Sequence, residues 1–79
     1  MVKKLTLDQP VTYEVAVPGT INEQWLDGNG ITVKAGTDEG GLPISILATT
    51  VDQAALHGLL RRLYALGLPL ISVICVSRD

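Results

Sequence analysis

The chain has 79 residues, of which 47% are hydrophobic and 18% are charged, and its formal net charge is −2. This length predicts a single domain over residues 1–79, with a core too small to give much stability by itself. One cysteine and one histidine exclude an internal disulfide and nearly exclude a Cys/His zinc site, so we expect no metal and no cofactor. The acidic balance argues against nucleic-acid binding, which needs clustered Lys and Arg.

The N-terminal segment is basic at its start but lacks the apolar stretch of a secretion signal. We expect residues 1–10 to form an irregular arm or an early edge strand. The longest apolar run, residues 66–76, is far shorter than a membrane span and contains Pro69. These features predict a cytoplasmic protein with no membrane partner.

The first regular pattern is an alternation of apolar and polar residues, which predicts a half-buried strand ended by Pro18 and Gly19. Its apolar positions are Val11, Tyr13, Val15 and Val17. Thr20 and Glu23 then have the spacing of a capping box, which predicts a short helix over residues 22–27. The alternative is a plain loop over residues 18–30.

Two further alternating segments, residues 31–36 and 44–49, flank a polar, glycine-rich turn and predict a β-hairpin. In the second of them, one face carries Ile44, Ile46 and Ala48, and the other carries Ser45, Leu47 and Thr49.

A second capping-box spacing, from Thr50 to Gln53, predicts that the main helix begins near Val51. Its leucines form one broad stripe: Leu56, Leu59, Leu60, Leu63 and Leu66. Gly67 is a natural stop, and Pro69 prevents the helix from continuing. Residues 70–76 then predict a final apolar strand.

The predicted order is therefore strand, short helix, strand, strand, helix, strand. This is the α+β, ferredoxin-like order β-α-β-β-α-β with a reduced first helix, in which the main helix covers one face of a four-stranded sheet. If residues 18–30 are a loop, the chain becomes a β-meander followed by a crossover with the same core.

The final strand is apolar on both sides. Leu70, Ile74 and Val76 share one side, and Ile71, Val73 and Cys75 share the other. We assign the second set, together with Leu47, to the sheet face away from the helix, where it would pack on a second copy of the chain. The alternative is that residues 1–10 fold over this face and cover it with Val2, Leu5 and Leu7.

The helix carries a second candidate contact surface, a ridge of small residues formed by Ala54, Gly58 and Ala65. Glycine inside a helix costs about 1 kcal/mol relative to alanine, so Gly58 suggests the close approach of another backbone. The alternative is an ordinary face exposed to solvent.

A candidate ligand site consists of His57, Arg61 and Tyr64, which are neighbours at helical spacing, with Trp25 beside them. These groups could hold a carboxylate or a phosphate. The alternative is that the three are ordinary helix-boundary residues and that Trp25 anchors the core. Cys75 lies among apolar residues, without the cationic neighbour of a reactive thiol, so we name no catalytic residue.

Residues 52–60, DQAALHGLL, and residues 66–73, LGLPLISV, resemble the C-terminal half of short uncharacterised bacterial proteins. The tryptophan-containing segment of that group is loosely similar to residues 25–28. The resemblance implies a free-standing bacterial domain and supplies no reaction.

We therefore expect a non-enzymatic interaction module that forms homo-oligomers, or docks on a larger assembly, through its sheet. The alternative is a small ligand-binding or enzymatic domain with a pocket between helix and sheet.

Overall fold

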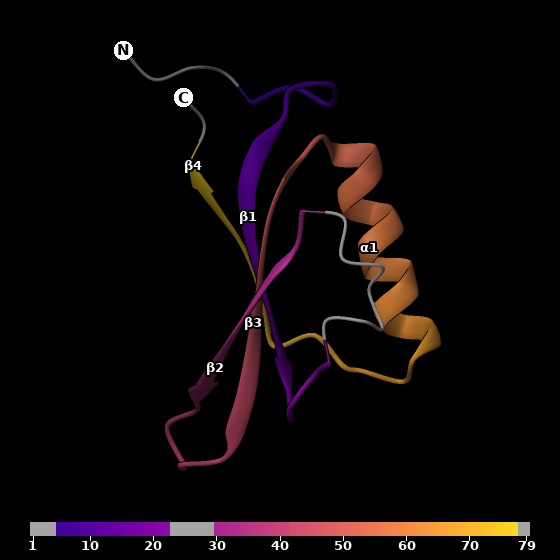
Figure 1. Cartoon of the computed structure of the whole chain (residues 1–79). Coiled ribbons are helices and arrows are strands. Elements are labelled where there is room, and N and C mark those ends of the chain that lie inside the picture. Colours follow the sequence, from indigo (N-terminus) through magenta and orange to yellow (C-terminus); the bar gives the residue numbers. More distant parts are fainter. Residues whose placement is uncertain (1–4, 23–29, 78–79) are drawn as a thin grey trace.

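The computed structural model describes residues 5–22 and 30–77. A single sheet of four strands carries a helix against one of its faces (Figure 1). The elements are β1 (Val11–Pro18), β2 (Thr32–Thr37), β3 (Pro43–Val51), α1 (Gln53–Ala65) and β4 (Ser72–Ser77). The α+β class and the four-stranded sheet with its helix are thus confirmed. The predicted short helix, with Glu23 and Trp25, lies outside the described residues apart from Asn22.

The strands are arranged in the order β2-β3-β1-β4, and every neighbouring pair is antiparallel. Val15, in the middle of β1, is paired with Leu47 of β3 on one side and with Val73 of β4 on the other. Side chains directly opposite each other in paired strands point to the same face. These three side chains therefore share one face of the sheet.

The core lies between this face and α1, because the alternation in β1 matches the leucine stripe of the helix. Its buried members are Val11, Tyr13, Val15 and Val17 of β1, Ile21, Leu47 of β3, and Leu56, Leu59 and Leu63 of α1.

Leu47 corrects one prediction from the sequence. We expected Leu47 on the face away from the helix, but its side chain is fully buried in the core. The pairing with Val15 decides this, since it places Leu47 on the helix side and Ile46 on the open side. The same pairing puts Val73 and Cys75 on the helix side rather than on the open face.

A polar group inside the core ties the segment after β1 to β3. The hydroxyl of Ser45, which is buried, donates to the carbonyl oxygen of Gly19 at 2.7 Å and accepts from the backbone N–H of Ile21 at 3.1 Å. Ser45 thus satisfies two backbone groups at once and holds Ile21 in place at the core.

The helix begins later than the sequence predicted. Thr50 does not cap it, because β3 continues to Val51 and the Thr50 hydroxyl lies 2.8 Å from that of Thr12 in β1. The cap is Asp52, whose carboxylate accepts from the backbone N–H of Ala55 at 2.9 Å. One residue therefore separates strand from helix.

The predicted stop at Gly67 is confirmed. Gly67 has a φ of 79°, and its N–H donates to the carbonyl of Tyr64, while the N–H of Leu68 donates to the carbonyl of Leu63. These two bonds form a Schellman motif, and Leu68 packs against the core as that motif requires.

Two glycine-to-alanine changes in and beside this helix are expected to have opposite effects. Gly67→Ala should lower the free energy of unfolding by about 1–2 kcal/mol, because a left-handed backbone is unfavourable for alanine. Gly58→Ala should raise it by about 1 kcal/mol, since apart from the adjacent helix backbone a Cβ there would first meet Nη2 of Arg61, at 4.0 Å. Urea denaturation measures both changes, and a loss of stability in Gly58→Ala would contradict the helix geometry.

Residues 5–10 form no strand or helix, in line with an irregular arm. The carbonyl of Leu7 accepts from the backbone N–H of Gln53 at 3.0 Å, and Leu5 packs against the core on the helix side. The alternative in which the arm covers the open face is therefore wrong for Leu5 and for Leu7, whose side chain is exposed. Val2 lies outside the described residues.

Candidate functional site

The most unusual surface is the edge strand β4 and the segment leading into it (Figure 1). Its large apolar side chains are each between 40 and 52% exposed: Leu70, Ile71, Val73, Ile74 and Val76. They project on both sides of the strand, because successive residues of a strand point to opposite faces. An edge strand also presents a row of unpaired backbone groups, so β4 offers both backbone hydrogen bonds and apolar area.

Nothing in the sequence of this edge discourages pairing with another strand. No charged residue lies between Arg62 and Arg78. The opposite edge, β2, carries Lys34 within the strand, and a charge of this kind is a common protection of edge strands. The two edges of the sheet are therefore chemically different, because β4 has no charged residue within the strand.

The face away from the helix is apolar in part. A Cβ on Gly36 would lie 3.5 Å from Cγ1 of Ile44 and 3.7 Å from Cδ1 of Ile46, so these two side chains lie over the glycine and cover each other partly. Glu14, in contrast, is paired with Ala48 on one side and Ile74 on the other. Because a carboxylate lies in the middle of this face, burying the whole face against a partner would be costly.

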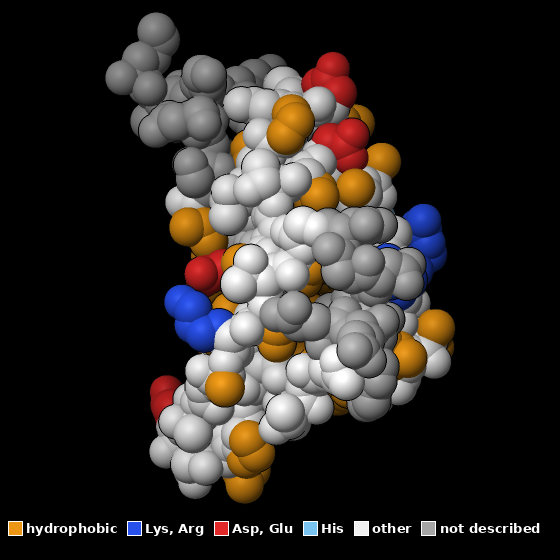
Figure 2. Space-filling model, viewed as in Figure 1, with side chains coloured by type: hydrophobic (Ala, Val, Ile, Leu, Met, Phe, Trp, Pro, Cys, Tyr) orange, Lys and Arg blue, Asp and Glu red, His pale blue; other side chains and the backbone are white. Residues whose placement is uncertain are grey.

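Hydrophobic side chains reach the surface in many separate places in Figure 2, and charged side chains are few. This matches the low charged fraction of the chain, 18%. The exposed apolar residues are therefore distinctive on β4 because they follow one another along one strand, rather than because they are numerous.

The structure places the predicted interface residues in different surroundings. Ile71 and Val73 are exposed on the β4 edge, whereas Cys75 is half-buried against the core and Leu47 is inside it. Ala54 is exposed on the helix.

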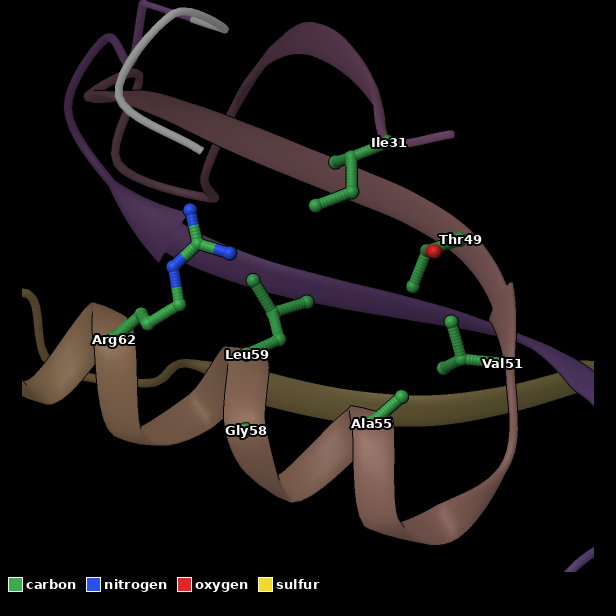
Figure 3. A pocket seen from close by; sticks show the side chains of 7 residues that line it. All are labelled: Ile31, Thr49, Val51, Ala55, Gly58, Leu59 and Arg62. Atoms are coloured by element: carbon green, nitrogen blue, oxygen red, sulfur yellow. The ribbon is translucent and has the colours of Figure 1, made fainter. Parts of the chain in front are cut away.

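Gly58, also predicted as an interface residue, lines a pocket between α1 and the end of β3. The pocket has a volume of about 280 Å³. The described residues that line it are Ala55, Gly58, Leu59 and Arg62 on the helix, and Ile31, Thr49 and Val51 on the sheet side. Figure 3 shows the side chains of Ile31, Leu59 and Arg62 extending toward a common space.

The predicted ligand residues do not line this pocket. His57, Arg61 and Tyr64 are exposed, Tyr64 to 85%, on the part of the helix that faces solvent. Trp25 lies outside the described residues. Among the described lining residues the charged one is Arg62, which is not one of the predicted ligand residues. Its spacing from Ala55, Gly58 and Leu59 is the i, i+3, i+4, i+7 pattern of one helix face, which was a usable signal.

Within residues 5–22 and 30–77, no group of three His, Cys, Asp or Glu side chains is arranged to hold a metal ion. No helix in the same ranges has both the length and the hydropathy of a membrane-spanning segment.

A family model for a domain of unknown function, DUF8691, matches residues 12–74. This match covers most of the chain, from the start of β1 into β4. The chain belongs to the DUF8691 family. No curated protein and no solved structure matches it.

The matched residues of the DUF8691 domain include the described pocket lining and most of the apolar β4 edge. All described residues that line the pocket lie within the match, as do Leu70, Ile71, Val73 and Ile74 of the apolar edge. The description of the family assigns no activity, so the function of this DUF8691 domain has to be argued from its surfaces.

Proposed function

We propose that this domain is a non-enzymatic interaction module that self-associates by pairing β4 of one copy with β4 of a second copy. The observation that carries the proposal is the row of exposed apolar side chains along an edge strand without charges and the segment before it, a row interrupted by Ser72 and Cys75. Pairing at this edge would satisfy the free backbone groups of β4 and remove apolar area on both faces from water.

A second copy is the partner that this chemistry favours. In an antiparallel pair related by a two-fold axis, each strand meets an identical one, so an uncharged strand meets no charge. A strongly charged partner would gain nothing from this edge. Glu14 supports pairing edge to edge rather than face to face, because only a face-to-face dimer would have to bury its carboxylate.

We also infer a ferredoxin-like topology for the module. The order β2-β3-β1-β4 with antiparallel neighbours supports it, since β1 lies between β3 and β4, as in a split β-α-β arrangement. The first helix of that topology would fall between β1 and β2, where the described residues are interrupted.

A charge at the edge tests the self-association. Ile74, 51% exposed, is paired with Glu14 of its own chain, so Ile74→Lys places an ammonium group where the folded monomer accepts it. In the dimer the two edges would bring like charges together, and we expect the dissociation constant to rise by about a hundredfold or more. Sedimentation equilibrium, with circular dichroism to monitor folding, measures this change.

Leu42→Lys is the matched control, because Leu42 is 65% exposed in the turn between β2 and β3, away from β4. This variant should keep the dimer of the unchanged chain. A native chain that stays monomeric at high micromolar concentration would overturn the proposal. An equal effect of the two lysine substitutions would overturn the assignment to β4.

A further inference from the structure

We infer that the pocket between α1 and the β2–β3 side of the sheet binds a small carboxylate with an apolar body, such as a medium-chain fatty acid. This site is distinct from the proposed β4 interface, because β1 and β3 lie between β4 and β2 in the sheet. The inference therefore does not depend on self-association.

The walls of the pocket favour an apolar body. Ile31, Val51, Ala55 and Leu59 contribute apolar side chains, and Gly58 contributes none, which leaves room beside the helix backbone. A volume of about 280 Å³, near the lower end of the range of ligand pockets (about 300 Å³), suits a small ligand such as octanoate.

The charge of the pocket favours a carboxylate at one end. Among the described residues that line it (within 5–22 and 30–77), Arg62 carries the only charge, and its side chain points from the last turn of α1 toward the space in front of the sheet (Figure 3). One guanidinium matches one carboxylate, because its planar fork donates two parallel hydrogen bonds. The group has five N–H donors, so it can receive a ligand and keep a partner within the protein.

A phosphate monoester fits this pocket less well than a carboxylate. It carries more negative charge and three acceptor oxygens, which normally require several donors or cations. The part of the lining that the structure describes contains one cation and one hydroxyl, that of Thr49, and its other side chains are apolar. One positive charge beside a long apolar wall thus favours a ligand with one negative charge and an apolar chain.

Titration of the ¹⁵N-labelled full chain with octanoate tests the inference, with octan-1-ol as the uncharged probe of the same length. The backbone amides of Ala55, Gly58 and Leu59 should shift on binding. Arg62→Gln should weaken octanoate binding by about tenfold and leave octan-1-ol unchanged, because the lost hydrogen bonds are to a charged group. Arg61→Gln, at the exposed neighbouring position, should change neither.

A second variant keeps the test decisive if Arg62→Gln does not fold. Ala55→Leu retains a good helix former and fills part of the pocket, so it should weaken both probes. The inference is overturned if octanoate moves no pocket amide. It is also overturned if Arg61→Gln and Arg62→Gln weaken octanoate equally, since that result would indicate general attraction to the helix. Neither result would bear on the oligomeric state.

Discussion

Replacing Leu47 by alanine is expected to lower the free energy of unfolding by about 2–5 kcal/mol, the largest effect among single substitutions considered for this chain. Leu47 lies in β3, is fully buried, and belongs to the cluster formed with β1 and α1. Its truncation removes apolar contacts and leaves a cavity that the surrounding strands cannot close. Urea denaturation followed by circular dichroism measures the loss directly.

The control for this experiment is Ile74→Ala, which removes a side chain of similar size from the β4 edge. At a concentration where the chain is monomeric, this substitution should change the free energy of unfolding by less than about 1 kcal/mol, because half of the side chain is already in water. If Leu47→Ala were instead as mild as Ile74→Ala, Leu47 would not be a core residue.

The second large effect is expected at Ser45. Ser45→Ala should cost about 1–3 kcal/mol, since it removes one donor and one acceptor and leaves the N–H of Ile21 and the carbonyl of Gly19 without their partner near the core. Hydrogen exchange should show a parallel loss of protection at the Ile21 amide. Loss of protection at the Ile21 amide in particular would show that the effect comes from the lost hydrogen bonds rather than from a general loss of packing.

Thr50→Val provides the matched control, because it also removes a hydroxyl from β3. The hydroxyls of Thr50 and Thr12 are exposed to solvent, and water replaces the lost hydrogen bond, so the cost should be a few tenths of a kcal/mol. Equal costs at Ser45 and Thr50 would mean that the buried bonds contribute no more than an exposed one.

Much of the secondary structure could be predicted from the sequence because local patterns determine it. Alternation located β1, β2 and β3, and Gly67 gave the end of α1. The helix start was wrong for a physical reason: Thr50 and Asp52 are both good caps, and the pairing of Thr50 with Thr12 in the sheet decided between them. That pairing joins residues far apart in the sequence and leaves no local signal.

The assignment of faces failed for a related reason. A period of two shows which residues share a face of a strand, but not which face turns inward. In β3 the outward set, Ile44 and Ile46, is at least as apolar as the inward set with Ser45 and Leu47, so composition pointed the wrong way. The register of β3 with β1 decides which face turns inward, and this register is a property of the tertiary structure.

The candidate pocket illustrates the same limit. The sequence identified a basic helix and favoured Arg61 because it is next to His57 and Tyr64 at helical spacing. Which arginine lines a pocket depends on where β3 and the start of β2 lie relative to the helix, and the structure selects Arg62. A rotation of the helix by one residue would have placed Arg61 at the pocket instead of Arg62.

The place of β4 in the sheet also has a consequence for how the chain is made. Tyr13 and Cys75 are directly opposite each other, so the last strand of the domain in chain order completes the pairing of the first. Until β4 has been synthesised, one side of β1 has no neighbour in the sheet, and its valines depend on β3 and the helix. The domain should therefore complete its fold only once β4 is present, at the slow rates typical of sheets closed by distant segments.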